Sequence, residues 1–345
     1  MPHDTFDELH FWFPYSARLS PPVAVPLPAP LVFGSSSCAP PLPRAAVAVG
    51  NFDGVHLGHA AIARRLREIA EREGVPAIAL TFDPHPASIV RPATAPVPLT
   101  TPARRAELLL ALGLDAVLVQ PANAALVAMP AEAFYHEILR GRLGGVAFVE
   151  GADFRFGARR AGDVHVLTQL ARADGVIVEV VAPVVVDGEP ISSSRLRALV
   201  AAGDVAAAAR LSTAPHRASG IVIEGARRGR QLGFPTANLG TVATLLPAAG
   251  VYAARASIQE EGPTRKWFAA AVNVGPAPTF GVSASGVEVH LVGYSGDCYG
   301  HMLDVDFLAR LRDTRRFPSA DDLAAQLATD VAQAAEIAAA FVQEP

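Results

Sequence analysis

The chain has 345 residues, 51% of them hydrophobic, and its formal net charge at pH 7 is -4. This length is typical of two domains, each with a core of its own. The small negative charge gives no basis for bulk binding to nucleic acid or to a membrane surface, so any recognition of phosphate must be local. The two cysteines are too few for a disulfide framework or a thiolate zinc site, which is typical of a cytoplasmic protein.

Residues 1–44 hold ten of the 29 prolines. A helix with so much proline cannot satisfy its backbone inside a bilayer. Asp4, Asp7 and Glu8 occupy the place where a signal peptide has its positive charges. We therefore expect a disordered, polyproline-like extension that stands apart from the functional domains.

From residue 45 to residue 212 apolar strands alternate with helical segments. Strands are predicted over 45–49, 76–82, 115–120, 145–150 and 175–181, and helices over 59–73, about 102–112, 131–140 and 163–173. This alternation predicts βαβ units and a mostly parallel sheet covered on both faces. In such sheets ligands bind beyond the carboxyl ends of the strands.

A helical connector over 191–211 leads to a second pattern. From residue 213 the runs are short, β-like and punctuated by glycine and proline, which predicts an antiparallel, barrel-like domain. An amphipathic helix over 319–342 follows. We therefore divide the chain into an extension (1–44), an α/β domain (45–212) and a barrel domain (213–345).

The segment "GNFDGVHLGH" (50–59) follows the first predicted strand. His56 and His59 lie three residues apart at the start of a helix, whose terminal amides attract anions. Gly50, Gly54 and Gly58 allow a ligand to approach the backbone closely. The pattern favours a phosphate site, and two alternatives stay open: histidines with a structural role, and a metal site that lacks cysteine ligands.

Three further segments stand near predicted strand or helix ends. "TFDPHP" (81–86) is a rigid loop that is either a turn or a pocket wall. "GADFRFGARRAGDV" (151–164) is either a solvated basic loop or a platform that stacks a planar ring and meets phosphates. "ISSSRLR" (191–197) supplies helix caps, and its hydroxyls and arginines also suit a polyphosphate.

The barrel half carries two candidate segments. In "GARRGRQLGFPTANL" (225–239) Thr236 and Asn238 share a face of an extended chain, and their oxygens suit Mg²⁺ held mainly by nucleotide phosphates. An ordinary turn is the alternative. In "GVEVHL" (286–291) Glu288 either faces solvent or lies on the interior face of the barrel as a general base.

Together these segments resemble the bacterial bifunctional riboflavin kinase/FAD synthetases, from about residue 46 to residue 340. The resemblance implies an α/β plus β fold. A Rossmann-like nucleotidyltransferase domain precedes a six-stranded antiparallel β-barrel riboflavin kinase domain that a terminal helix closes. It implies phosphorylation of riboflavin to FMN, then adenylylation of FMN to FAD, with ATP and Mg²⁺ and with neither zinc nor haem.

In the α/β domain the resemblance implies that His56 and His59 hold the ATP phosphates during adenylyl transfer. The other implied ATP-binding residues are Gly50, Phe52, Asp53, Gly54, Asp153, Ser192, Ser193, Ser194 and Arg195. The implied flavin-binding residues are Phe82, Pro84, Pro86 and Phe156. Asp153 stands where some members have Asn, and Ser194 replaces the usual Thr.

In the barrel the resemblance implies that Glu288 is the catalytic base and that Thr236 and Asn238 are the Mg²⁺ ligands. The implied ATP-binding residues are Gly225, Gly229, Arg230, Gly233, Phe234, Pro235, Thr236 and Asn238. Thr314 stands where the family has Glu. Two alternatives remain: a protein that retains one of the two activities, and a non-catalytic flavin- or nucleotide-binding regulatory protein.

Overall fold

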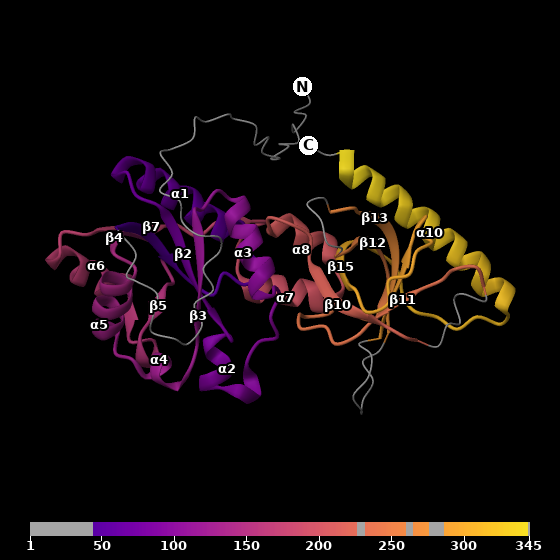
Figure 1. Ribbon diagram of the computed structural model, residues 1–345, viewed down its shortest axis with the longest axis horizontal. Helices are drawn as coiled ribbons and strands as arrows, with labels where there is room; N and C mark the ends of the chain where they lie inside the picture. Colours follow the sequence, from indigo (N-terminus) through magenta and orange to yellow (C-terminus); the bar gives the residue numbers. More distant parts are fainter. Residues whose placement is uncertain (1–43, 226–231, 260–264, 276–285, 344–345) are drawn as a thin grey trace, which may run out of the picture.

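The computed structural model describes residues 44–225, 232–259, 265–275 and 286–343. The proline-rich stretch 1–43 lies outside these residues, as do Gly229 and Arg230 of the predicted kinase loop. Figure 1 shows two units side by side, a sheet covered by helices and a barrel beside it.

The first unit contains a parallel five-stranded sheet with the order β3-β2-β1-β4-β7. Its strands are β1 (Ala45–Val49), β2 (Ala77–Asp83), β3 (Ala116–Pro121), β4 (Gly145–Gly151) and β7 (Ile177–Val181). All five residues of β1 are buried, because β1 is central and both faces of the sheet are covered. The predicted parallel sheet is confirmed.

Two helices pack on each face of this sheet. α1 (Leu57–Glu73) and α3 (Pro102–Ala111) cover one face, where Leu66 and Ile69 are fully buried. Each such side chain contributes about 2 kcal/mol of transfer free energy. The π-helix η2 (Phe134–Arg142) and α6 (Val164–Ala173) cover the other face. The helix predicted over 131–140 is therefore present, and most of it is π-helical.

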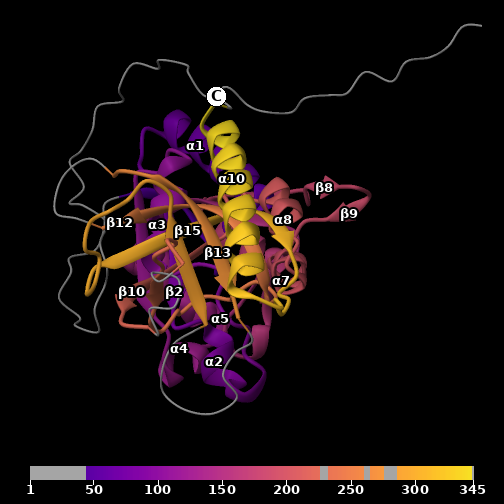
Figure 2. The same ribbon diagram turned by 90° about the vertical axis from the view of Figure 1, so that its right-hand side faces the viewer.

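The shorter elements of this unit lie in its loops. They are α2 (Pro86–Val90), η1 (Pro92–Thr94), α4 (Ala124–Ala128), α5 (Ala131–Ala133), η3 (Ala158–Arg160), the ribbon β5 (Arg155–Phe156) with β6 (Gly162–Asp163), and the hairpin β8 (Val185–Val186) with β9 (Glu189–Pro190). In Figure 2 this hairpin projects from the body of the molecule.

The order of the strands reverses between β1 and β4. The chain leaves β1 toward β2 and β3 on one side, and β4 and β7 lie on the other. Such a switch point opens a crevice at the carboxyl ends of the two strands, where doubly wound sheets bind ligands. The N–H of Val49 donates to the buried Glu150 carboxyl at 2.8 Å, which joins the two strand ends below the crevice.

Two helices connect the units. Ser192 caps α7 (Ser193–Ala202), and Gly203 ends it with φ +83°, a conformation that favours glycine. Asp204 then caps α8 (Val205–Leu211) by accepting the Ala207 N–H at 2.9 Å. The predicted helical connector is confirmed.

The second unit is a closed antiparallel barrel with the strand order β10-β11-β14-β13-β12-β15. Its strands are β10 (Arg217–Ile223), β11 (Ala237–Leu239), β12 (Gly250–Ile258), β13 (Phe268–Val274), β14 (Val287–Leu291) and β15 (Met302–Arg312). Apolar residues alternate along each strand and fill the interior. The predicted six-stranded barrel is confirmed.

The terminal helix α10 (Ala320–Gln343) packs against β12, β13 and β15 (Figure 2). Arg312 at the end of β15 donates to the buried Asp330 of α10, with Nε to Oδ1 at 3.0 Å and Nη2 to Oδ2 at 2.6 Å. Among the described residues no helix combines the length and apolarity that crossing a bilayer requires.

Candidate functional site

The loop from Gly50 to His56, which we call the histidine loop, connects β1 to α1 at the carboxyl end of the sheet. Phe52 and Val55 adopt positive φ angles of 46° and 36°, which non-glycine residues rarely do. Both side chains are buried, so the packing of the loop holds this backbone in place. Backbone strain of this kind persists where the surroundings impose it and is concentrated at functional sites.

His56 and His59 face each other at the start of α1. Their rings stack with centroids 3.6 Å apart at 19°, and the His56 N–H donates to Nδ1 of His59 at 3.3 Å. The ring Nδ1 of His56 is buried and has no hydrogen-bond partner in the described part of the chain. The structure thus brings the predicted pair together at a helix N-terminus.

Burial sets the protonation of both histidines. It lowers the pKa of His56 to about 4, although the Asp153 and Asp53 charges act to raise it. Burial also holds the pKa of His59 well below its usual range, and His56 and Arg105 lower it further. Both rings are neutral at pH 7, so they offer a phosphate N–H donors rather than full positive charges.

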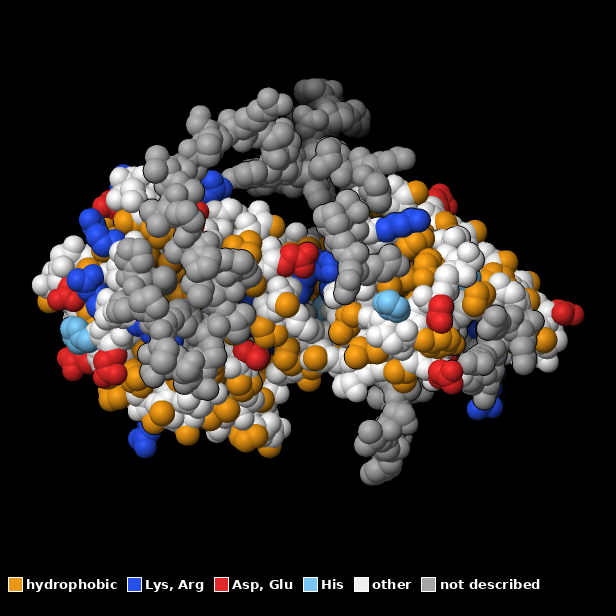
Figure 3. Space-filling model, viewed as in Figure 1, with side chains coloured by type: hydrophobic (Ala, Val, Ile, Leu, Met, Phe, Trp, Pro, Cys, Tyr) orange, Lys and Arg blue, Asp and Glu red, His pale blue; other side chains and the backbone are white. Residues whose placement is uncertain are grey.

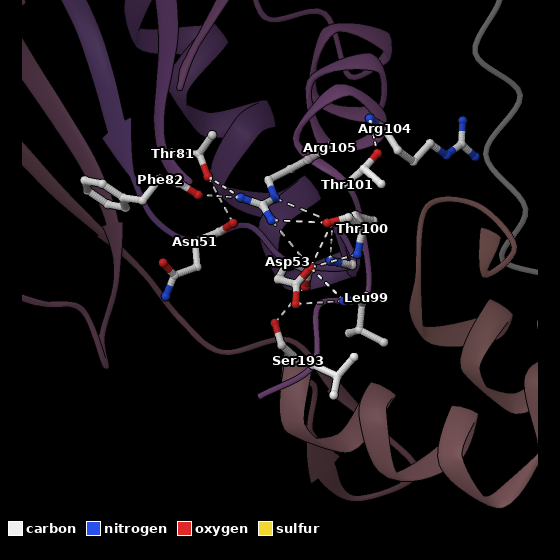
Figure 4. Close-up of polar contacts among 12 residues, drawn as sticks. Asn51, Asp53, Thr81, Phe82, Leu99, Thr100, Thr101, Arg104, Arg105 and Ser193 are labelled. Atoms are coloured by element: carbon white, nitrogen blue, oxygen red, sulfur yellow. Dashed lines mark hydrogen bonds and ion pairs between the residues drawn. The ribbon is translucent and has the colours of Figure 1, made fainter. Parts of the chain in front are cut away.

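Asp53 lies at the centre of a buried polar cluster (Figure 4). Its carboxylate accepts the N–H groups of Leu99 at 3.0 Å and Thr100 at 2.9 Å, and the Thr100 hydroxyl at 2.9 Å. Arg197 pairs with it, and Nη2 of Arg105 lies 3.7 Å away. The protein itself therefore uses the Asp53 carboxylate fully, and Figure 4 shows the Asn51 side chain turned away from it.

The predicted serine segment lies against this cluster. Ser193 donates its hydroxyl to the Asp53 carbonyl at 2.8 Å. The Ser192 hydroxyl caps α7 by accepting the Arg195 N–H at 3.2 Å, and Ser194 is exposed. The caps expected from the sequence are thus present, and Ser193 joins α7 to the histidine loop.

Two arginines of α7 point to different partners. Arg195 donates to the carbonyl oxygens of Val186 at 2.9 Å and Glu189 at 3.0 Å, which holds the β8–β9 hairpin. Arg197, which the family resemblance left without a role, donates to the Val97 carbonyl at 3.0 Å and pairs with Asp53. The nearer structural link to the histidine loop is therefore Arg197.

The predicted flavin-binding residues lie at the end of β2, at the start of α2 and in β5, and Phe82 and Phe156 belong to the same apolar cluster. Phe82 is half-buried at the end of β2, and Pro84 is exposed beside the partly buried Pro86. Phe156 is buried in the core, where its ring stacks on that of Phe154 with centroids 5.4 Å apart. Phe154 is less buried than Phe156, so it is the more accessible ring of the "DFRFG" segment.

Asp153 is exposed on the loop after β4. Its negative charge acts to raise the pKa of His56. A Cβ on Gly151 would lie 3.1 Å from Oδ1 of Asp153, so a glycine there leaves the side chain room.

The second predicted site lies on the outer surface of the barrel. Asn238 of β11, Glu288 of β14 and Asn273 of β13 are direct cross-strand neighbours. Val287 and Val289 point inward, and Glu288 is exposed. Glu288 therefore faces outward, and the expectation of a place on the interior face is wrong, because the apolar neighbours of Glu288 fill the barrel. Its role as a general base is a separate question from this orientation.

The polar segment before β11 packs beside β14. A ring nitrogen of His290 lies 2.8 Å from the Pro235 carbonyl, and the Phe234 and His290 rings meet edge to face. A Cβ on Gly225 would lie only 2.2 Å from Nδ2 of Asn238, so any side chain there would displace the Asn238 amide. Thr236 is partly buried one residue before β11, and Gly233 adopts a φ of +83°.

Sequence reasoning missed the residues that join these segments. Arg105 donates to the Thr81 hydroxyl at 3.0 Å and the Phe82 carbonyl at 3.1 Å, which ties α3 to the end of β2. Arg105 and Thr100 fall in the stretch "LTTPARR" (99–105), whose only local signal is a capped helix start. Asn273 lies in the mostly apolar run "FAAAVNV" (268–274), where nothing in the local sequence marks it as a site residue.

The described residues contain no cluster of three or more His, Cys, Asp or Glu side chains that would hold a metal ion. On the part of the face in Figure 3 that the grey residues leave uncovered, acidic and basic side chains are interspersed among apolar ones.

Comparison with known proteins assigns the chain to a family. The FAD synthetase family matches residues 39–195 and the riboflavin kinase family matches residues 212–338. A bifunctional riboflavin kinase/FMN adenylyltransferase from Pseudomonas fluorescens is 38% identical over 310 residues, which cover 90% of this chain and 98% of that protein. The protein of the same description from Escherichia coli K12 is 33% identical over 288 residues, which cover 84% and 91%.

A crystal structure of a macrolide-efflux protein from Streptococcus pneumoniae superposes with a TM-score of 0.74 at 30% identity, covering 86% of this chain and 95% of that one. The two matched families follow each other in the same order as the sheet and the barrel. The chain therefore belongs to the bifunctional riboflavin kinase/FMN adenylyltransferase family, as its motifs predict.

Proposed function

We propose that the chain catalyses both reactions of its family, each in one unit. The barrel phosphorylates riboflavin with ATP to give FMN and ADP. The α/β unit then joins FMN to the adenylyl group of a second ATP, which gives FAD and pyrophosphate. The observation that carries this proposal is the presence of two separate polar sites, one at the switch point of the sheet and one on the barrel surface.

In the barrel Glu288 is the catalytic base. It takes the proton of the riboflavin 5′-hydroxyl while that oxygen attacks the γ-phosphorus of ATP and ADP leaves. The outward orientation of Glu288 leaves its carboxylate open to a substrate. Asn238 and Asn273 lie on either side of Glu288, where amide groups can orient the reacting hydroxyl.

The oxygens around Asn238 suit Mg²⁺. Thr236 and Asn238 supply hard oxygen donors, and Mg²⁺ in nucleotide sites needs few protein ligands because phosphates and waters complete its shell. Because Gly225 has no Cβ, the Asn238 side chain can lie directly against the backbone there. When bound, Mg²⁺ would neutralise charge on the ATP phosphates.

In the α/β unit the phosphate of FMN attacks the α-phosphorus of ATP, and pyrophosphate leaves. Such transfers need positioning and charge stabilisation and no protein nucleophile. The neutral rings of His56 and His59 and the free amides of α1 would hold the departing phosphates. Phe82, Pro84, Pro86 and the "DFRFG" loop would line the flavin, with Phe156 supporting Phe154 from the core.

Two variants of the full chain test this assignment, each serving as the control for the other. Glu288→Gln should abolish FMN formation from riboflavin while FMN supplied directly is still converted to FAD. His56→Asn should abolish FAD formation from supplied FMN while riboflavin is still converted to FMN. Product amounts are measured by chromatography after incubation with ATP and Mg²⁺.

Loss of both activities in one variant would contradict the separation of the two sites. A wild-type chain that makes FMN and no FAD would point to Asp153, which places a negative charge beside the ATP phosphates. A chain that makes FAD only from supplied FMN would point to Thr314, which is exposed between β15 and α10. A wild-type chain that forms neither product would leave a flavin-binding protein.

A further inference from the structure

The short linker between α8 and β10 contacts the histidine loop of the other unit. Thr213 donates twice to the Val55 carbonyl, from its N–H at 3.2 Å and from its hydroxyl at 2.8 Å. The preceding residue, Ser212, pairs with His56 as an isolated antiparallel bridge. Two consecutive linker residues therefore hold the two consecutive residues with which the loop enters α1.

Val55 is a position that needs such support. It is fully buried, and its φ of +36° lies in a region that β-branched residues avoid. The N–H of Val55 donates to the Phe52 carbonyl at 3.1 Å. The Val55 carbonyl belongs to the peptide unit that ends at the His56 nitrogen. A contact that fixes this carbonyl therefore also fixes the backbone of His56, from which the ring extends.

Thr213 supports the histidine loop from outside the α/β unit. It lies within the residues that match the riboflavin kinase family, 212–338, and beyond those that match the FAD synthetase family, 39–195. A second contact also runs from the barrel half of the chain to the α/β unit. Leu245 of the barrel donates to the Pro98 carbonyl at 2.8 Å, next to Leu99, which in turn donates to Asp53. Both contacts support the histidine loop from the barrel side.

We propose that Thr213 is a positioning residue for adenylyl transfer, acting through the Val55 carbonyl on the placement of His56. The inference rests on the proposed adenylyltransferase function of the α/β unit and extends it to a residue outside that unit's motifs. Thr213 touches no substrate. Its hydroxyl holds the peptide that presents the histidine ring to the ATP phosphates.

The test uses the full-length chain and measures both reactions in each variant. Thr213→Val removes the hydroxyl and keeps the shape and the backbone N–H contact. Thr213→Ser keeps the hydroxyl. Ser212→Ala is the matched control, because the Ser212 hydroxyl donates to the Ala208 carbonyl at 2.6 Å, within the helix end and away from the loop.

Thr213→Val should lower kcat for FAD formation from FMN about tenfold or more, since small misplacements of a catalytic group cost up to about a hundredfold. The KM for ATP should change less, because the ring is misplaced for the transition state while most of the nucleotide site stays intact. FMN formation from riboflavin should be unchanged. Thr213→Ser should restore FAD formation, and Ser212→Ala should match wild type.

Four results would overturn the proposal. They are a Thr213→Val chain as active as wild type in FAD formation, a proportional loss of both activities, failure of Thr213→Ser to restore FAD formation, and an equal loss in Ser212→Ala. If wild type itself forms no FAD from FMN, the proposed function fails and the inference fails with it. That outcome is separate, since it is read from wild type alone.

Discussion

Replacing Asp53 by Asn distinguishes two roles for this residue. The family resemblance makes it an ATP-binding residue, whereas in the structure its carboxylate is surrounded by protein donors and is only 1% exposed. Asn has nearly the same shape and removes the negative charge. If the carboxylate supports the loop, the main consequence is lost stability of the α/β unit.

The contacts give the size of this loss. The substitution leaves Arg105 and Arg197, whose side chains are 5% and 17% exposed, without their anion. Removing one partner of a buried pair costs about 3–5 kcal/mol. An amide also offers one acceptor oxygen where the carboxylate offers two. With that oxygen at the Oδ1 position, the N–H groups of Leu99 and Thr100 keep their acceptor and the amide NH2 faces Arg197, which loses its acceptor, at about 1–3 kcal/mol. These costs overlap, and we expect about 3–5 kcal/mol in total.

Calorimetry of the full chain, with both activities measured alongside, checks this expectation. The transition of the α/β unit should move to lower temperature, and riboflavin phosphorylation below that transition should be unchanged. The reasoning would be refuted if Asp53→Asn abolished FAD formation while the α/β unit lost less than about 1 kcal/mol, the size of one ordinary hydrogen bond. Asp53 would then act on the nucleotide itself.

Two further predictions follow from single residues. Between pH 6.5 and pH 4 the unfolded chain binds a proton at His56 more readily than the folded chain, whose His56 pKa is about 4, so acidification should remove up to about 3 kcal/mol of stability. Denaturation at several pH values should show a smaller loss in His56→Asn, and equal slopes would contradict the assignment. Gly225→Ala should lower riboflavin phosphorylation about tenfold or more by displacing Asn238, with FAD formation from FMN as the unaffected control. Unchanged phosphorylation would show that Asn238 tolerates the shift.

The architecture could be predicted because it follows from local periodicity. The strand over 45–49 is apolar at every position, which is how a central parallel strand covered on both faces reads. In β14 the alternation of Val287, Glu288, Val289 and His290 fixes two opposite faces. Alternation alone does not say which face is the interior, and the apolar residues decide it because they must be buried.

The polar cluster could not be predicted, since its members come from distant parts of the sequence. Asp53 meets Thr100 across 47 residues and Arg197 across 144, and no local pattern marks such pairs. In "ISSSRLR" the two arginines are equivalent by sequence. Only the fold turns Arg195 toward the β8–β9 hairpin and Arg197 toward Asp53.

Contacts between distant segments also explain why the "GNFDGVHLGH" motif depends on residues outside its own domain. The histidine loop adopts a backbone conformation that its own residues disfavour at Phe52 and Val55. Its support comes from the segment before α3, from α7 and from the linker, none of which belongs to the "GNFDGVHLGH" segment. A loop that depends on outside contacts responds to whatever moves them. One of these contacts is Thr213, at the entrance to the barrel, so the residue that precedes His56 depends on a side chain outside the α/β unit.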